Sequence, residues 1–155
     1  MQIRIAIQVD SEAITTLINA TFSKAEAFFI DGDRITLQAV QSLMEKGKFL
    51  LAHDQGTITG CVYVELRGER AYLGLLSVDP EHQRAGLGTV LMNAAEKYCA
   101  ESGCRFMDLQ IVNLRTELPA FYRKRGYLET GTAPFPREFS PKLSCHFVKW
   151  SKALT

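Results

Sequence analysis

The most informative stretch of the chain is Gln83-Arg84-Ala85-Gly86-Leu87-Gly88. It follows an apolar run at residues 71–78, typical of a strand, and precedes residues 89–100, whose apolar side chains recur at helical spacing. The first backbone N–H groups of a helix have no intrahelical partner, and the helix dipole places partial positive charge there. Glycine lets the backbone approach a ligand closely. The order of strand, glycine-containing turn and helix therefore predicts an anion site, and a ligand that carries phosphate.

Size and composition are those of one globular domain spanning residues 1–155. Hydrophobic residues make up 46% of the chain and charged residues 23%, and the formal net charge is +1. This balance provides no strong field for nucleic acid or an acidic membrane, so we expect neither as a partner. No apolar run reaches transmembrane length and no signal-peptide pattern is present, which predicts a cytoplasmic location.

The cysteines and histidines show no pattern of a metal site. The four cysteines form no Cys-x-x-Cys pair, and the three histidines stand at no metal-ligand spacing to them. We therefore expect reduced, buried thiols and no bound metal.

Periodicity and turn residues predict two helices and four strands in the first half of the chain. Asp10 is expected to cap the first helix, and Asp31-Gly32-Asp33 is expected to form a turn and cap the second. The expected strands cover residues 2–9, 49–53, 57–66 and 71–78, and the expected helices run from Asp10 through Ile18 and from about 37 to Gly47.

The second half predicts two further helices and three strands. The helix at 89–100 carries Val90, Leu91, Ala94, Ala95 and Tyr98 inward, and Gly103 stands where its C-terminal cap belongs. Further elements are expected at 106–112 (strand), about 117–125 (helix), 127–130 (strand), 131–142 (a loop with three prolines) and 145–150 (strand). The order β-α-α-β-β-β-α-β-α-β-β predicts an α+β domain, a sandwich-like α/β/α arrangement around a mixed, mostly antiparallel sheet.

Three phosphate-binding patterns compete for residues 83–88. A P-loop requires lysine and then serine or threonine after its last glycine, but Thr89 and Val90 follow Gly88. A dinucleotide fingerprint requires a third glycine where Leu91 stands. The third pattern, Gln/Arg-x-x-Gly-x-Gly/Ala after a strand that ends in Val-x-Pro, fits Val78-Asp79-Pro80 and residues 83–88.

With these residues the chain resembles the GNAT superfamily of N-acetyltransferases, over essentially its whole length. Residues 121–127, Phe-Tyr-Arg-Lys-Arg-Gly-Tyr, are similar to the distal motif of that family, and the predicted element order matches its fold. The resemblance implies acetyl-coenzyme A as the acetyl donor. It implies a cofactor site made of Leu76, Val78, Gln83, Arg84, Ala85, Gly86, Leu87, Gly88, Thr89, Asn113 and Tyr122.

The same resemblance implies how these residues act. The amides of residues 84–89 would hold the diphosphate, with Arg84 adding charge-assisted contacts. The backbone of Leu76 and Val78 would pair with the pantetheine arm, for which the fourth and fifth strands must splay apart. Asn113 would touch the same arm, although it lies nine residues before Tyr122, two more than in the family's common pattern.

Acetyl transfer to an amine requires a neutral amine, an oxyanion donor and a proton for the leaving thiolate. Tyr122 matches the family tyrosine near the thioester sulfur and is the expected catalytic acid; alternatively it is a core tyrosine, as Phe121 and Tyr127 are expected to be. Tyr72 stands where some family members carry a glutamate base, so Glu65 is the nearest candidate carboxylate, unless it is only a solvent-facing strand residue. His146 could relay a proton or be structural, and the role of Arg115 stays open.

The acceptor is expected between residues 21–34 and 131–143. Glu26, Phe28, Phe29, Asp31 and Asp33 could form a wall for a cationic amine, or only a core, a turn and a helix cap. The sequence predicts an N-acetyltransferase that moves an acetyl group from acetyl-coenzyme A to a primary amine of a small molecule by direct attack. Alternatives are a protein N-terminal or lysine acetyltransferase and a non-catalytic acyl-coenzyme A-binding or regulatory domain. By family analogy alone, two copies would pair as a homodimer through the last strands.

Overall fold

The computed structural model describes residues 2–154, with the side chains of Arg84 and Ala85 left aside. In chain order the elements are β1 (Gln2–Ile5), η1 (Gln8–Asp10), α1 (Ser11–Glu26), α2 (Leu37–Lys46), β2 (Lys48–Asp54), β3 (Thr57–Arg67), β4 (Arg70–Val78), η2 (Pro80–Ala85), α3 (Leu87–Glu101), β5 (Phe106–Val112), α4 (Leu118–Lys124), β6 (Leu128–Pro134), η3 (Arg137–Phe139) and β7 (His146–Ala153). Within the described part of the chain, no helix is long and apolar enough to cross a membrane.

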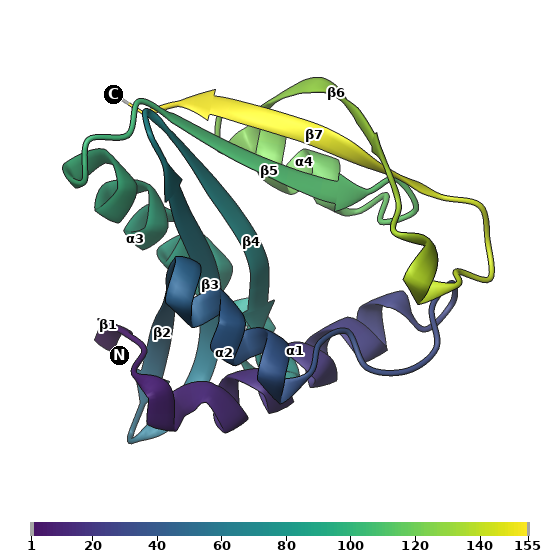
Figure 1. The fold of residues 1–155 in the computed structure, drawn as a ribbon. Helices are drawn as coiled ribbons and strands as arrows, with labels where there is room; N and C mark the ends of the chain where they lie inside the picture. Colours follow the sequence, from purple (N-terminus) through teal and green to yellow (C-terminus); the bar gives the residue numbers. More distant parts are fainter. Residues whose placement is uncertain (1, 155) are drawn as a thin grey trace.

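A seven-stranded sheet of order β1-β2-β3-β4-β5-β7-β6 forms the centre of the molecule (Figure 1). Strands β4 and β5 run parallel, while every other neighbouring pair in the sheet is antiparallel. Helix α3 connects β4 to β5, as a parallel pair requires a crossover. The mixed, mostly antiparallel sheet and the α+β order predicted from the sequence are confirmed.

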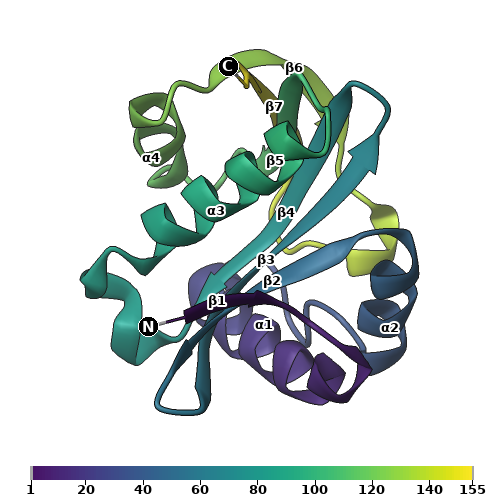
Figure 2. The same ribbon diagram turned by 90° about the vertical axis from the view of Figure 1, so that its left-hand side faces the viewer.

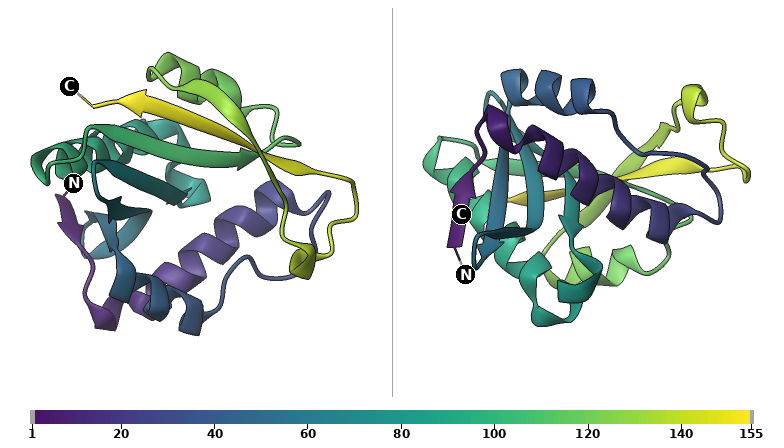
Figure 3. Two further views of the ribbon diagram at one scale, coloured as in Figure 1. Left: turned by 45° about the horizontal axis from the view of Figure 1, so that its top comes forward. Right: turned by 90° about the horizontal axis from the view of Figure 1, so that it is seen from below.

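Helices cover both faces of the sheet, which produces the expected α/β/α layers. Helices α1 and α2 lie on one face, and α3 and α4 lie on the other (Figures 2 and 3). The α3 side holds a large buried cluster that includes Val62, Leu73 and Leu91, and the α1 side holds a second cluster around Ile14, Ile18 and Phe49. Each helix buries one apolar face and so fixes where its ends lie.

The two central strands separate along their length. The β4–β5 ladder contains only the pairs Arg70–Phe106, Ala71–Met107 and Tyr72–Asp108. Beyond Tyr72 the strands diverge into a V, visible in Figure 1. The outer edge of β4 remains paired with β3, and that of β5 with β7, so the unpaired edges face each other across the gap. The splay that the family resemblance implied is present.

Neither expected aspartate caps its helix with its side chain. Asp10 stands at the N-cap position of α1 but its carboxylate is engaged elsewhere, and Thr36 takes the N-cap position of α2. The carboxylate of Asp10 accepts from the Ile7 N–H at 2.8 Å and pairs with Arg4 at 2.7 Å, so it closes η1 rather than capping α1. Helix α2 is capped by Thr36, whose hydroxyl accepts from the Ala39 N–H at 3.1 Å, and not by Asp33.

Two expected boundaries also differ. The first strand ends at Ile5 instead of residue 9, because the chain turns into η1. Residues 131–134, expected to be loop, continue β6 to Pro134. A proline is tolerated there because β6 is an edge strand and Pro134 is its last residue.

The four cysteines are free thiols, as the sequence predicts. Cys61, Cys99 and Cys104 are buried and Cys145 is partly exposed. Burial raises the pKa of Cys61 and of Cys99 to about 12, so both stay protonated at neutral pH.

Leu91 tests how firmly α3 is held on the sheet. It is fully buried, and a Cβ placed on Gly60 of β3 would lie 2.8 Å from its Cδ1 atom. Leu91→Ala should therefore lower the free energy of unfolding by about 2–5 kcal/mol in urea denaturation. Leu128→Ala, at a side chain 70% exposed, should change it by no more than about 0.5 kcal/mol. Similar losses in both variants would contradict this packing.

Candidate active site

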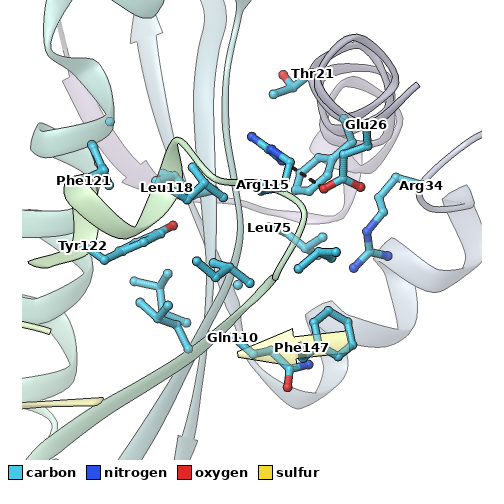
Figure 4. Close-up of a pocket in the computed structure, with 18 of the residues that line it drawn as sticks. Thr21, Glu26, Arg34, Leu75, Gln110, Arg115, Leu118, Phe121, Tyr122 and Phe147 are labelled. Carbon is cyan, nitrogen blue, oxygen red and sulfur yellow. Dashed lines mark hydrogen bonds and ion pairs between the residues drawn. The ribbon is translucent and has the colours of Figure 1, made fainter. Parts of the chain in front are cut away.

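A cavity of about 580 Å³ occupies the gap between β4 and β5 (Figure 4). At one end it is bordered by η2, the start of α3 and α4, and at the other by α1 and the segment between β6 and β7. We call these the turn end and the aromatic end. The aromatic end contains Phe22, Phe135, Phe139 and Phe147.

The turn end presents the uncapped start of α3. Gly86 has φ +74, a left-handed conformation that glycine adopts without strain, and as the N-cap residue it offers the helix no side-chain cap. The first intrahelical bond is donated by the Val90 N–H to the Gly86 carbonyl at 3.2 Å, so the amides of Leu87, Gly88 and Thr89 precede it. The Leu87 side chain is buried in the core, whereas Gly86, Gly88 and Thr89 line the cavity. The predicted anion turn therefore opens into the cavity.

Gln83, one of the predicted turn residues, lines the cavity and also holds the end of β4. The side-chain amide of Gln83 donates to the Val78 carbonyl at 3.1 Å, and Thr21 donates to the same oxygen at 3.3 Å. These bonds tie the end of β4 to η2 and α1. The expected charge contact of Arg84 falls on a side chain outside the described residues, as does the side chain of Ala85.

Strand β4 carries a bulge where it borders the cavity. Gly60 pairs with Val78 and Tyr63 with Gly74, so β4 has one residue more than β3 between these pairs. Leu75 lies in this bulge with φ +55, a conformation that is uncommon for a leucine. Because a bulge bends its strand, it turns β4 away from β5 and directs Leu75 and Leu76 to the cavity.

Tyr122 reaches the cavity from α4. Tyr122 is only 6% exposed, and its hydroxyl points into the cavity in Figure 4. Burial raises the pKa of Tyr122 to about 12, although the positive charges of Arg115 and Arg125 oppose the shift. The phenol is thus a protonated donor at neutral pH. Phe121, expected in the core, is only partly buried and lines the same cavity, while Tyr127 is fully buried as expected.

Asn113 and His146 hold each other at the ends of β5 and β7. The Asn113 side-chain oxygen accepts from the His146 N–H at 2.8 Å, and the Asn113 N–H donates to the His146 carbonyl at 2.9 Å. Neither residue is among those that line the cavity. The arrangement accounts for Asn113 as a strand-end clamp and does not bring it to the predicted cofactor site.

Glu65 also lies apart from the cavity. Its carboxylate accepts from the Tyr63 hydroxyl at 2.7 Å and from Arg67 at 2.6 Å, and the first of these bonds, with help from the second, lowers the pKa of Glu65. It pairs across the sheet with Tyr72, which does line the cavity. A carboxylate with a lowered pKa and two donors is a weak base, so the position does not favour the predicted catalytic role.

A buried ion pair between Glu26 and Arg115 lines the cavity. Arg115 donates to Glu26 of α1 at 2.9 Å and to Glu117 at 2.9 Å. The side chains of Glu26 and Arg115 are only 8% and 13% exposed, whereas Glu117 is 60% exposed. Burial raises the pKa of Glu26, and the bond from Arg115 opposes that shift. Arg115 therefore links the segment after β5 to α1 and compensates a charge that would otherwise be costly.

The two segments expected to bind the acceptor do meet at the aromatic end. Thr21, Phe22, Glu26 and Arg34 come from the first, and Phe135 and Phe139 from the second. Phe28 and Phe29 do not line the cavity: Phe29 is fully buried and Phe28 is 53% exposed. Asp31 pairs with Lys142 at 2.9 Å and thereby joins the two segments.

Arg125 is a further residue that sequence reasoning did not single out. Its guanidinium donates to the Phe121 carbonyl at 2.7 Å and to the Thr89 hydroxyl, and lies over the Phe121 ring at 3.6 Å. It connects α4 to the first turn of α3 and adds positive charge beside the anion turn. The only signal in the sequence was its place next to Gly126, at the end of the predicted helix.

The Glu26–Arg115 pair predicts a stability defect that depends on pH. Arg115→Met leaves the buried carboxylate uncompensated, so at neutral pH it should cost about 3–5 kcal/mol of unfolding free energy. A carboxyl group whose pKa is raised in the folded protein binds a proton more readily in the folded state than in the unfolded state. Its favourable contribution to the free energy of unfolding is complete below the unfolded pKa, near 4.3, and is lost as the pH rises through the folded pKa. The defect of Arg115→Met should therefore grow as the pH rises from near 4.3 towards neutral.

The matched control is the double variant Glu26→Gln with Arg115→Met, compared by urea denaturation at each pH. The neutral amide removes the titrating charge, so most of the lost stability should return at the higher pH and the remaining loss should vary little with pH. An Arg115→Met defect that is equally large across this range, or that Glu26→Gln does not reduce, would contradict the account.

Comparisons with known proteins agree with this geometry. A profile of the acetyltransferase (GNAT) family matches residues 12–127. Among curated relatives, the uncharacterized N-acetyltransferase YitH of Bacillus subtilis is 29% identical over 119 residues, which cover 76% of this chain and 38% of YitH. The chain spans less than half the length of three of the curated relatives that it matches, YitH among them.

Solved structures share the fold. An aminoglycoside 6'-N-acetyltransferase complexed with coenzyme A matches with a TM-score of 0.80 at 19% identity, covering 100% of this chain and 98% of the other. The ribosomal-protein-S18-alanine N-acetyltransferase from Escherichia coli matches with a TM-score of 0.79 at 16% identity, covering 99% and 94%. With the splayed strands and the uncapped helix start in place, the family match leads to one conclusion: the chain belongs to the acetyltransferase (GNAT) family, a family of acyltransferase enzymes.

Proposed function

We propose that the protein transfers an acetyl group from acetyl-coenzyme A to the primary amine of a small molecule, by direct attack while both substrates are bound. The observation that carries this proposal is the cavity between the unpaired edges of β4 and β5, with the free amides of α3 at its turn end. A long ligand with an anionic diphosphate at one end of a pantetheine arm and a thioester at the other end of that arm fits such a passage.

In this proposal the diphosphate of acetyl-coenzyme A binds the amides of Leu87, Gly88 and Thr89. The positive end of the helix dipole and the nearby Arg125 favour the negative charge. The pantetheine arm lies along β4 beside Leu76 and satisfies backbone groups that β5 leaves unpaired. The coenzyme A bound to a structural neighbour supports this choice of cofactor.

The reaction then needs no covalent enzyme intermediate. The neutral amine attacks the thioester carbonyl, and a backbone N–H on the unpaired edge of β4 can donate to the resulting oxyanion. As the carbon–sulfur bond breaks, the electron pair leaves on sulfur, and the Tyr122 hydroxyl donates to this thiolate. Before the attack the bound ammonium loses one proton to water, since Glu65 is engaged by Tyr63 and Arg67 away from the cavity. After the attack the nitrogen of the tetrahedral intermediate loses a second proton to water, and this proton balances the one that Tyr122 gives to the thiolate and regains from solvent.

The aromatic end favours a small acceptor over a protein chain. The segment from β6 to β7 places Phe135 and Phe139 against this end, and the link from Lys142 to Asp31 fastens that segment to the loop after α1. Protein N-termini or lysines are the second candidate acceptors, because one neighbour is a ribosomal-protein-alanine N-acetyltransferase. A panel of amines and peptides, followed by the release of thiol from acetyl-coenzyme A, separates the two.

Gly88→Asp tests the diphosphate site without disturbing the fold. A Cβ at Gly88 would make an ordinary contact of 3.5 Å with the Phe121 ring, and an acidic residue at a helix start is favourable for stability. The new carboxylate would repel the diphosphate, and two charges about 5 Å apart in a site of intermediate dielectric interact by about 3 kcal/mol. Calorimetry should therefore show acetyl-coenzyme A affinity reduced by at least about tenfold, with an unchanged melting temperature. Undiminished affinity would place the diphosphate elsewhere.

Tyr122→Phe tests the acid. Removing the donor to the leaving thiolate should lower kcat by about a hundredfold or more, while the dissociation constant of acetyl-coenzyme A changes little. Tyr98→Phe, at a partly buried tyrosine of α3 outside the cavity lining, is the matched control and should leave kcat unchanged. Equal turnover in wild type and Tyr122→Phe would remove the acid role. Tight acetyl-coenzyme A binding without thiol release for any acceptor would instead favour the non-catalytic binding domain.

A further inference from the structure

One guanidinium at the aromatic end forms no ion pair among the described residues, although it lies near enough to Glu26 for its charge to oppose the raised pKa of that carboxyl group. Arg34, in the loop between α1 and α2, lines the cavity and is partly buried. Among the described residues it makes no hydrogen bond and no ion pair, whereas Arg115 nearby binds two carboxylates. Figure 4 shows Arg34 extending towards the cavity on the side of Glu26 away from Arg115.

Two aromatic rings hold Arg34 without satisfying its hydrogen bonds. Its Cζ atom lies over the ring of Phe22 at 5.5 Å and over that of Phe139 at 5.3 Å from the centroids. Such contacts stabilise the cation and restrict the side chain, but every N–H of the guanidinium still needs an acceptor. A restrained guanidinium with free N–H groups is already organised to bind an anion through two parallel hydrogen bonds.

The charges of this end define which anion fits. Glu26 is ion-paired with Arg115, and Glu117 is largely exposed to solvent, so Arg34 is the arginine of this end that has no direct ion pair among the described residues, although its charge also opposes the raised pKa of Glu26. A single negative charge neutralises the Arg34 guanidinium. A dianionic phosphate would leave an excess negative charge close to the carboxylate of Glu26, which is unfavourable in a partly desolvated site.

We propose that the acceptor amine carries a carboxylate, that Arg34 binds this group, and that the apolar part of the acceptor lies against Phe22, Phe139 and Phe147. This inference rests on the proposed function and adds the substrate class: an amino-carboxylate with an apolar body, rather than a polycationic amine. Arg34 acts as a specificity residue, since it binds the end of the acceptor that does not react.

The test measures binding, so it does not depend on having found the natural acceptor. Three probes of one shape differ in charge at the far end: para-(aminomethyl)benzoate, its benzamide, and para-(aminomethyl)benzylamine. Glycylphenylalanine and its amide form a second pair of different length. Each is titrated by calorimetry into protein saturated with coenzyme A, which permits no turnover. A charge-assisted pair to the guanidinium should make each carboxylate bind about tenfold or more tightly than its amide, and the diamine should bind most weakly.

Three variants identify the residue responsible. Arg34→Met keeps an apolar side chain between the two rings and should abolish the preference for the carboxylate. Arg34→Lys keeps the charge without the fork and should retain part of it. Arg137→Met makes the same charge change at an exposed arginine of η3 that does not line the cavity, and it should keep the preference.

The outcomes separate this inference from the proposed function. Failure of coenzyme A itself to bind in the first titration would contradict the proposed function. If coenzyme A binds, equal affinities for carboxylate and amide, no detectable binding of either carboxylate at millimolar concentration, or a preference that survives in Arg34→Met would overturn the role of Arg34 alone.

Discussion

The arrangement of the site depends on the loss of pairing between β4 and β5 beyond Tyr72 and Asp108. Parallel strands at the centre of a sheet normally continue their ladder, because unpaired buried N–H and carbonyl groups are costly. Here the bulge at Leu75 bends β4 while β7 holds β5 on its other side, so the two edges separate and remain open. A ligand with amides of its own can supply the missing partners, which makes the gap a binding site rather than a defect. In the proposed function the start of helix α3, at the end of this gap, binds the diphosphate.

Two arginines line the cavity and differ in their partners. Arg115 is shared between Glu26 and Glu117 and fastens the segment after β5 to α1, so the buried carboxylate is compensated and the aromatic end keeps its shape. Arg34 lies over the rings of Phe22 and Phe139 and forms no ion pair within the described part of the chain. Tyr122, raised in pKa by its burial, lies between this end and the turn end as a neutral donor. In the proposed function the cavity thus combines a helix start for the cofactor, a protonated phenol and a ring-lined end with a guanidinium for the acceptor.

The sequence predicted those features that depend on local chemistry. Apolar periodicity located the helices and strands, and Gly86 and Gly88 between a strand and a helix indicated the turn and helix start that open into the cavity. It could not predict contacts between distant segments. The left-handed conformation of Leu75 has no local sequence signature, and the partner of Glu26 lies 89 residues away. Asp10 and Asp33 are residue types that often cap helices, but Asp10 bonds to other partners and Thr36 caps α2 in place of Asp33. Asn113 and Glu65 had suitable chemistry, yet both are engaged outside the cavity, Asn113 by His146 of β7 and Glu65 by Tyr63 and Arg67 of its own strand.

The central claim is that the gap between β4 and β5 receives the acetyl-coenzyme A arm, and a crystal structure of that complex tests it most directly. The account predicts the diphosphate on the amides of Leu87, Gly88 and Thr89, the arm hydrogen-bonded to the unpaired edge of β4, and the thioester within reach of the Tyr122 hydroxyl. A complex in which β4 and β5 extend their ladder beyond Tyr72 and Asp108, with the cofactor bound outside the gap, would contradict it.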